Sequence, residues 1–360
     1  MRSNPPSRGS EISYFPSPLA GGWVAMRPNR VVGMILVVFA ILLALPAAAA
    51  DFYDGKTVNL YVGFAPGGSY DLFGRIVAHH LAGKLPGNPT VVVRNMPGAG
   101  SVSLSNYMMR VAPKDGTALA IVSESVTTDQ LLGNPGIEYD ADKFGWVGRM
   151  TSSSSAFFAW HTSPTKTFAD VRQRETLLGS SGSGLTIDTP RALNALAGAK
   201  FKLITGYRGS TEVMLAMERG EVEVGYALWS DFKTRKADWL ADKKVNVLFL
   251  MASAHDPAFP GIPLTDELAP TQEGNRILHL LASSSAIGRA IFTTPDVPAA
   301  RLEILRTAFK AMTADAEYHA DAKQAGLELD PLDGASLQKV VAELMALPKA
   351  LIEKAKQARK

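Results

Sequence analysis

A glycine turn between a strand pattern and a helix pattern is the feature that most constrains the fold. Residues 57–62 alternate as a buried strand does, and apolar residues recur at helical spacing over 72–81. The turn at 64–68 contains one proline and two glycines, Ser69 follows as the expected N-cap, and Asp71 lies in the first helical turn. A helix N-terminus presents free N–H groups and the positive end of the helix dipole, so this turn predicts a binding site for a small anion.

The N-terminal segment has the pattern of an export signal. A basic patch, an apolar run at 31–45 and a series of alanines up to Ala50 are typical of a secretory signal peptide that is cleaved after Ala50. Because Met26 directly precedes the basic patch, we interpret residues 1–25 as an extension that results from a start codon assigned too far upstream. Residues 26–50 are then the signal peptide. The apolar run is shorter than the about 20 residues that a spanning helix needs, which favours cleavage over a membrane anchor.

Composition excludes several classes of protein. The chain has no cysteine, so disulfides, thiolate metal sites and a lipidated cysteine anchor are all absent. The net charge of +3 comes from the N-terminal 50 residues, and the remainder is close to neutral, which argues against a nucleic-acid binder. The six histidines lack the spacing of metal ligands along the sequence. We therefore expect neither a metal site nor a cofactor.

Strand patterns alternate with helix patterns along the mature chain. Such alternation predicts an α/β fold with helices flanking mainly parallel sheets. The predicted strands lie at 57–62, 91–93, 118–122, 176–178, 201–205, 222–226 and 245–251. A helix is expected to begin at Thr189 and Pro190, with threonine as the N-cap and proline as the first helical residue.

About 310 residues are more than one core comfortably holds, so we expect two domains. Serine and threonine clusters at 151–155 and 283–285 interrupt the alternation, and we interpret them as two crossings between the domains. The first domain would then comprise residues 51–149 plus 286–360, and the second residues 150–285.

Four turns rich in glycine or serine stand directly after predicted strands. They lie at 66–69, 95–101, 179–184 and 206–210. Ligands of parallel sheets bind beyond the carboxyl ends of the strands, so these turns predict one cleft with two turns from each domain. For any single turn, a plain chain reversal explains the glycines equally well.

Three other residues near predicted strand ends have two interpretations each. Ser123 either contacts a ligand or caps the following helix. Tyr207 and Trp229 belong either to a cleft wall or to the edge of the core.

Catalytic signatures are poor. Gly98, Ala99 and Gly100 begin a dinucleotide fingerprint, but Ser103 stands where the third glycine belongs. Ser183 likewise occupies the position at which a nucleophile elbow around Ser181 requires glycine. We do not expect an enzyme. The alternatives are an exported enzyme with a nucleotide cofactor at 98–100 and a ligand sensor for a partner signalling protein.

The order and spacing of six motifs resemble the solute receptors of tripartite tricarboxylate transporters, also called Bug-type receptors. The motifs are FAPGGSYD at 64–71, NMPGAGS at 95–101, APKDGTAL at 112–119, GSSGSG at 179–184, GYRG at 206–209 and RGEVE at 219–223. The resemblance covers essentially the whole mature chain.

The resemblance implies a periplasmic binding protein in which two α/β domains close on a ligand, as a Venus flytrap does. It implies a small organic carboxylate as ligand, held by main-chain N–H groups and ordered water, and delivery to the transmembrane subunits of the transporter. We expect a monomer. The ligand-binding residues implied are Ala65, Gly67, Gly68, Ser69 and Asp71 on one side, Ser181, Gly182, Ser183 and Tyr207 on the other, with Ser123 and Trp229 beside them.

The sequence departs from the family pattern around the second set of turns. Glu223 stands where the family usually has aspartate, and Ile187 and Asp188 replace a usual histidine. The resemblance therefore does not identify which carboxylate is bound.

Overall fold

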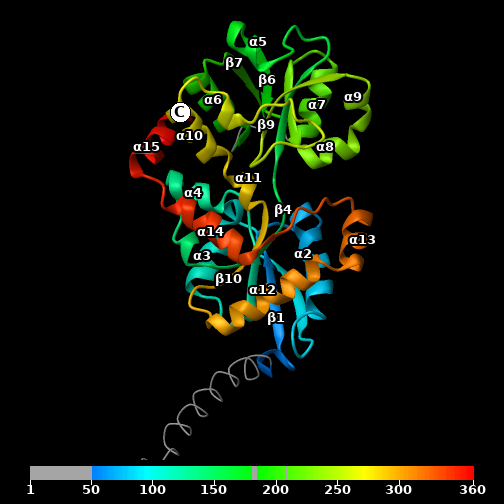
Figure 1. Ribbon diagram of the computed structural model, residues 1–360, viewed down its shortest axis with the longest axis vertical. Helices are drawn as coiled ribbons and strands as arrows, with labels where there is room; N and C mark the ends of the chain where they lie inside the picture. Colours follow the sequence, from blue (N-terminus) through cyan, green and yellow to red (C-terminus); the bar gives the residue numbers. More distant parts are fainter. Residues whose placement is uncertain (1–50, 181–184, 208) are drawn as a thin grey trace, which may run out of the picture. The chain divides into compact units, whose positions relative to one another are not determined.

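The computed structural model of the chain describes residues 51–180, 185–207 and 209–360 (Figure 1). Two mixed β-sheets, each flanked by helices, make up this part of the chain. No helix within it is long and apolar enough to cross a membrane. The expected signal peptide lies outside the described residues.

The first sheet has six strands in the order β11-β4-β10-β3-β1-β2. They are β1 (Thr57–Val62), β2 (Thr90–Asn95), β3 (Ala118–Ile121), β4 (Gly145–Thr151), β10 (Arg289–Thr293) and β11 (Leu332–Asp333). β1 pairs in parallel with β2 and β3, whereas β10 is antiparallel to both β3 and β4.

The second sheet has five strands in the order β7-β6-β8-β5-β9. They are β5 (Ser155–Trp160), β6 (Thr176–Ser180), β7 (Phe201–Thr205), β8 (Val224–Leu228) and β9 (Val245–Met251). β6 pairs in parallel with β7 and β8, and β5 is antiparallel to β8 and β9.

The expected α/β fold is confirmed, but the sheets are mixed rather than mainly parallel. The reason lies in how the chain changes sheets. β4 ends at Thr151 and β5 begins four residues later in the other sheet, so β5 starts from the edge at which its neighbours end. β10 enters the first sheet from the second in the same way. The carboxyl ends of the parallel strands and the first residues of β5 and β10 therefore share these edges.

Helices cover both faces of each sheet (Figure 1). One face of the first sheet packs on α2 (Ser69–Ala82), α12 (Ala299–Thr313) and α13 (Ala316–Gln324). One face of the second packs on α7 (Ser210–Glu218), α8 (Trp229–Arg235) and α9 (Ala237–Ala241). The remaining faces contribute to one continuous apolar cluster.

The remaining helices are short or belong to that continuous cluster. They are α3 (Val102–Arg110), α4 (Val126–Leu132), α5 (Phe168–Gln173), α6 (Leu185–Ala197), α10 (Gln272–Ala282), α11 (Ser284–Ile287), α14 (Gly334–Met345) and α15 (Lys349–Ala358), with 3-10 turns η1 (Asp51–Tyr53), η2 (Ala99–Ser101), η3 (Ala141–Lys143) and η4 (Thr265–Glu267). The last helix, α15, packs against α10 and α6 as well as α4, and so contacts helices of both sheets (Figure 1).

Two helices begin earlier or are capped differently than the sequence predicts. The helix expected to start at Thr189 is already formed at Leu185, and Pro190 lies inside it. Proline lacks an N–H group, so α6 gives up one backbone hydrogen bond near its start. The N-cap of α2 is Gly68, and Ser69 is the first helical residue rather than the cap.

The chain changes sheets between Thr151 and Ser155, and returns between Met251 and Arg289. These crossings contact each other, because the N–H of Ser153 donates to the carbonyl of Ser285 at 3.0 Å. The exact domain boundaries stay a prediction.

Candidate functional site

The turn between β1 and α2 has an exposed tip on a buried base. All five residues from Ala65 to Ser69 are exposed, whereas Gly63 is buried. A Cβ on Gly63 would lie 2.4 Å from the Ser101 hydroxyl oxygen, so only glycine fits there. Gly67 has φ +88°, a region that favours glycine, but Gly68 has an ordinary φ of −83°. Gly68 therefore has conformational and steric room for a side chain in this structure.

The Asp71 carboxylate is committed to the turn itself. It is 3% exposed and accepts hydrogen bonds from the Gly67 N–H at 2.9 Å, from Asn95 Nδ2 at 2.9 Å and from Arg75 Nε at 2.9 Å. Burial alone would raise the pKa of Asp71, but these hydrogen bonds outweigh it and hold that pKa below its usual value. Asp71 therefore stabilises the turn that precedes α2.

The first N–H groups of α2 have no acceptor among the described residues. Its first helical hydrogen bond runs from the Leu72 N–H to the Gly68 carbonyl, so the N–H groups before Leu72 have no acceptor within the helix. Gly68 has no side chain, and α2 has no side-chain cap. A 14-residue helix thus directs uncapped N–H groups and its positive end towards the exposed tip.

Ser101 joins three turns at the carboxyl ends of neighbouring strands. Its hydroxyl donates to the Gly63 carbonyl at 3.3 Å and accepts from the Ser123 N–H at 3.1 Å. Ser101 is 2% exposed and adopts φ +77°, which is unfavourable for serine. Sequence reasoning placed Ser101 in a glycine turn but missed this role, because no local pattern reveals it. The Ser123 hydroxyl meets the Ser125 hydroxyl at 2.9 Å, within its own turn.

A buried charged network contacts Tyr70 in the first turn of α2. The Tyr70 hydroxyl donates to Glu124 Oε2, and Arg289 Nη1 donates to that oxygen at 3.0 Å and to the Ser153 hydroxyl at 2.5 Å. The guanidinium carbon of Arg289 lies 4.0 Å from the centre of the Tyr70 ring. No local sequence pattern predicts this network, because Glu124 and Arg289 are 165 residues apart.

The turns of the second sheet are described only in part. Ser181, Gly182 and Ser183 lie outside the described residues. Tyr207 is partly buried against the cluster of α7 and α8, and burial together with the nearby Glu221 raises the pKa of its hydroxyl.

Trp229 is the first residue of α8 and is only 3% exposed. Its indole N–H donates to Asp256 Oδ2 at 2.6 Å, and Lys233 Nζ donates to the same oxygen at 2.9 Å. These three residues line a cavity of about 320 Å³ that Thr151 of β4 and Asp330, which precedes β11, also border. Trp229 is therefore both part of the core and the wall of a cavity between the two sheets.

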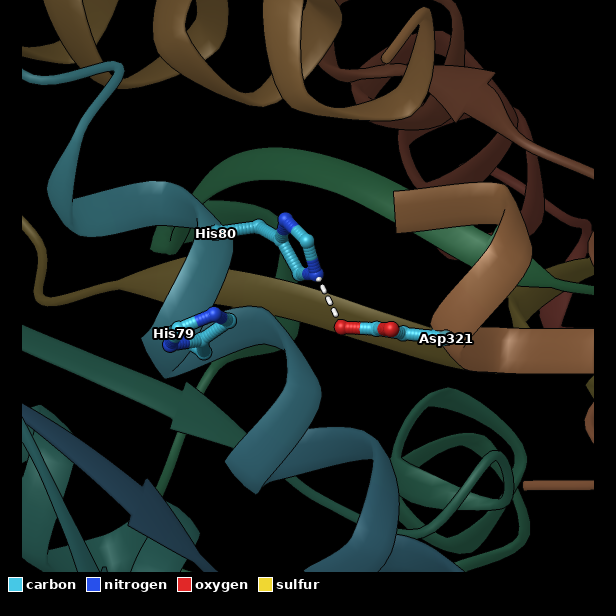
Figure 2. A group of neighbouring side chains, drawn as sticks. All are labelled: His79, His80 and Asp321. Carbon is cyan, nitrogen blue, oxygen red and sulfur yellow. Dashed lines mark hydrogen bonds and ion pairs between the residues drawn. The ribbon is translucent and has the colours of Figure 1, made fainter. Parts of the chain in front are cut away.

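One group among the described residues has the composition of a metal site. Figure 2 shows His80 of α2 facing Asp321 of α13, with His79 beside it. Ligand atoms of the three lie within 4.8 Å of one another, and His80 Nε2 lies 2.8 Å from Asp321 Oδ2. The group stands in the last turn of α2, about 15 Å along the helix from the glycine turn. The contact between His80 and Asp321 links α2 to α13, and this structural role is sufficient to explain the group.

Comparison with known proteins places the chain among receptors. The sequence profile of the tripartite tricarboxylate transporter family receptor matches residues 73–356. A Cupriavidus necator protein, named UPF0065 protein in gbd 5'region, is 28% identical over 324 residues, which cover 87% of this chain and 92% of that protein.

Two solved structures share the fold. A TctC solute binding protein from Polaromonas, solved with no ligand, has a TM-score of 0.65 at 20% identity and covers 84% of this chain and 99% of its own. The Rhodopseudomonas palustris protein Rpa4515, solved with adipate, has a TM-score of 0.56 at 20% identity, with 84% and 97% covered.

Proposed function

Because the chain belongs to the tripartite tricarboxylate transporter receptor family, whose members are periplasmic solute-binding proteins and not enzymes, we propose that it captures a small organic carboxylate and delivers it to the transmembrane subunits of such a transporter. This membership removes the nucleotide-dependent enzyme as an alternative. The proposal includes export with cleavage after Ala50, action as a monomer, and closure of two domains on the ligand.

The observation that carries the proposal is the uncapped N-terminus of α2 behind an exposed glycine tip. Carboxylates accept hydrogen bonds from clustered backbone N–H groups of this kind, and the helix dipole favours their negative charge. The nearby Asp71 does not oppose an anion strongly, because its carboxylate is buried and already hydrogen-bonded to Arg75, Asn95 and Gly67.

In this proposal the ligand lies against Ala65, Gly67, Gly68 and Ser69. Ser181, Gly182, Ser183 and Tyr207 would approach it from the second sheet, with Ser123 and Trp229 beside them. Asp71, Ser123 and Trp229 would act through the positions of their neighbours, since their side chains are engaged within the protein. The adipate seen in the Rhodopseudomonas palustris relative supports a carboxylate as the ligand class.

The test is substitution of Gly68 by valine. The nearest atom to a Cβ at Gly68 is 3.9 Å away and the backbone is in an ordinary region, so the fold should tolerate the change. A branched side chain there would block the approach of a carboxylate to α2. We expect Gly68→Val to lower the affinity for adipate, succinate, malate or citrate, whichever the wild type binds, at least 100-fold by calorimetry.

Gly83→Val is the matched control, because Gly83 stands at the other end of α2 with no atom within 4 Å of its Cβ position. Its affinity should equal that of the wild type. Retention of wild-type affinity in Gly68→Val would contradict the proposed site.

A further inference from the structure

Arg289 is the first residue of β10 and stands at the edge that carries the glycine turns. It pairs with Thr151, the last residue of β4. Gly288 before it has φ +54°, and a Cβ there would lie 2.1 Å from the Thr151 carbonyl oxygen. The return crossing is thus held tightly against the outgoing one, and the Arg289 side chain is placed between the crossings and α2.

The guanidinium of Arg289 is buried but not fully used. The residue is 6% exposed, and its Nε has no hydrogen-bond partner among the described residues. Only Nη1 makes the contacts to Glu124 and Ser153. A buried donor without an acceptor costs free energy, so an acceptor that reached this group would be bound favourably.

A small cavity adjoins both Arg289 and the N-terminus of α2. It measures about 40 Å³ and is bordered by Arg289, by Ser69 and Phe73 of α2, and by Ser230 of α8. One water molecule needs roughly 10–15 Å³ on this measure, so the three heavy atoms of a carboxylate fit and an aromatic ring does not. The positive end of α2 and the guanidinium both favour an anion here.

We propose that Arg289, beside Ser69 and Phe73 of α2, provides a charged subsite for a carboxylate group of the ligand. This inference rests on the proposed function and adds an ionic contact to the main-chain contacts of the glycine turn. A ligand with two carboxylates would place one at the turn of Gly67 and Gly68 and the other at Arg289.

Glu124 limits the strength of this subsite. Its carboxylate lies 3.0 Å from Arg289 Nη1 and partly neutralises the guanidinium that an anion would meet. Glu328 borders the cavity itself and also opposes an anion there. Removing the negative charge of Glu124 should strengthen binding of a second carboxylate, whereas a purely structural Glu124–Arg289 pair would give no such gain.

The experiment compares carboxylates of equal length with one or two charged ends. Succinate and butanoate, and adipate and hexanoate, are titrated into the full mature protein by calorimetry. The wild type should bind the dicarboxylate of at least one pair tenfold or more tightly than the monocarboxylate. Arg289→Gln should bring this ratio close to one, and Glu124→Gln should raise it at least threefold.

Arg149→Gln is the matched control, since Arg149 is an equally buried arginine on the paired strand and does not border this cavity. Its ratio should remain that of the wild type. If Arg289→Gln fails to fold, the ratio of dicarboxylate to monocarboxylate affinity in Glu124→Gln tests the subsite instead. A ratio equal to or lower than that of the wild type overturns the subsite. Equal binding of both members of each pair by the wild type overturns the subsite but leaves the receptor proposal standing. Failure of the wild type to bind any of the four also overturns the subsite, and it contradicts the receptor proposal only if the wild type binds neither malate nor citrate.

Discussion

Arg149 and Arg289 occupy neighbouring strands and are buried to the same degree, yet their surroundings differ. Arg149 is 7% exposed and all three of its side-chain nitrogens donate: Nε to the Asp330 carbonyl at 3.3 Å, Nη1 to the Ala286 carbonyl at 2.8 Å and Nη2 to Asp330 Oδ2 at 2.9 Å. Arg289 is 6% exposed, and towards the described part of the chain only its Nη1 donates.

Burial alone therefore does not distinguish an arginine that stabilises the fold from one that can bind a ligand. Burial lowers the pKa of Arg149, and the nearby Asp330 opposes that shift. The charge of Arg149 is therefore stabilised by partners within the protein. Arg289 instead retains a donor with no acceptor beside a cavity. The number of unmatched donors distinguishes the two.

The largest expected effect comes from neutralising the acidic partner of each arginine. Glu124→Gln leaves the buried Arg289 charge without its counter-ion and should destabilise the protein by about 3 kcal/mol. Asp330→Asn should cost less than about 1 kcal/mol, because the Asp330 side chain is 59% exposed and Arg149 keeps two backbone carbonyls. Urea unfolding measures both losses of stability, as shifts of the unfolding midpoint while the dependence of the unfolding free energy on urea concentration stays constant. Equal losses would remove the distinction between the two sites.

Replacing each arginine by lysine should cause a smaller loss of stability. Here the larger loss is expected at Arg149 rather than at Arg289. Lysine cannot reproduce the planar fork of Arg149, so the carbonyls of Asp330 and Ala286 lose donors and stability falls by about 2 kcal/mol. At Arg289 a lysine ammonium can still meet Glu124, and we expect a loss of about 1 kcal/mol. Thermal unfolding compares the variants; a larger loss at Arg289 would show that its present contacts are its main role.

The smallest effect concerns Arg75, an arginine that is paired but exposed. Its side chain is 57% exposed, so Arg75→Ala should cost under about 1 kcal/mol at pH 7. The folded-state pKa of Asp71 is lowered, so its contribution to stability is present above the unfolded value of about 3.9 and is lost as the pH falls through the folded value.

Removing Arg75 raises that folded pKa and should therefore reduce the loss of stability between pH 5 and pH 3. Melting temperatures of the wild type and Arg75→Ala at pH 7, 5 and 3 give the comparison. An identical acid-induced loss in both would show that Gly67 and Asn95 alone set the Asp71 pKa.

The parts of the fold that sequence predicts well are local. The strands at 201–205 and 245–251 have the predicted bounds, and the turn before α2 joins a strand to a helix as expected. Apolar periodicity and turn residues act over a few positions, so the sequence displays them directly. β5 and β10 were not among the predicted strands, and their antiparallel direction depends on the edge from which the chain enters each sheet.

The site is less visible in the sequence than the fold. Asp71 could be read as a residue of the first helical turn, but not as a partner of Asn95, which requires the pairing of β1 with β2. Glu124, Ser153 and Arg289 come together only through the crossings between sheets. Each is an ordinary charged or polar residue in its own segment, so no local pattern distinguishes it.

The most direct test of the account is thermal unfolding of residues 51–360 with mono-, di- and tricarboxylates, aromatic acids and acidic amino acids, after bound ligand has been removed. A ligand at about 100 times its dissociation constant adds about 2.7 kcal/mol of stability, which raises the melting temperature by several degrees. The account predicts such a rise for one class of carboxylate. An unchanged melting temperature with every compound, in protein shown to be folded, would contradict it.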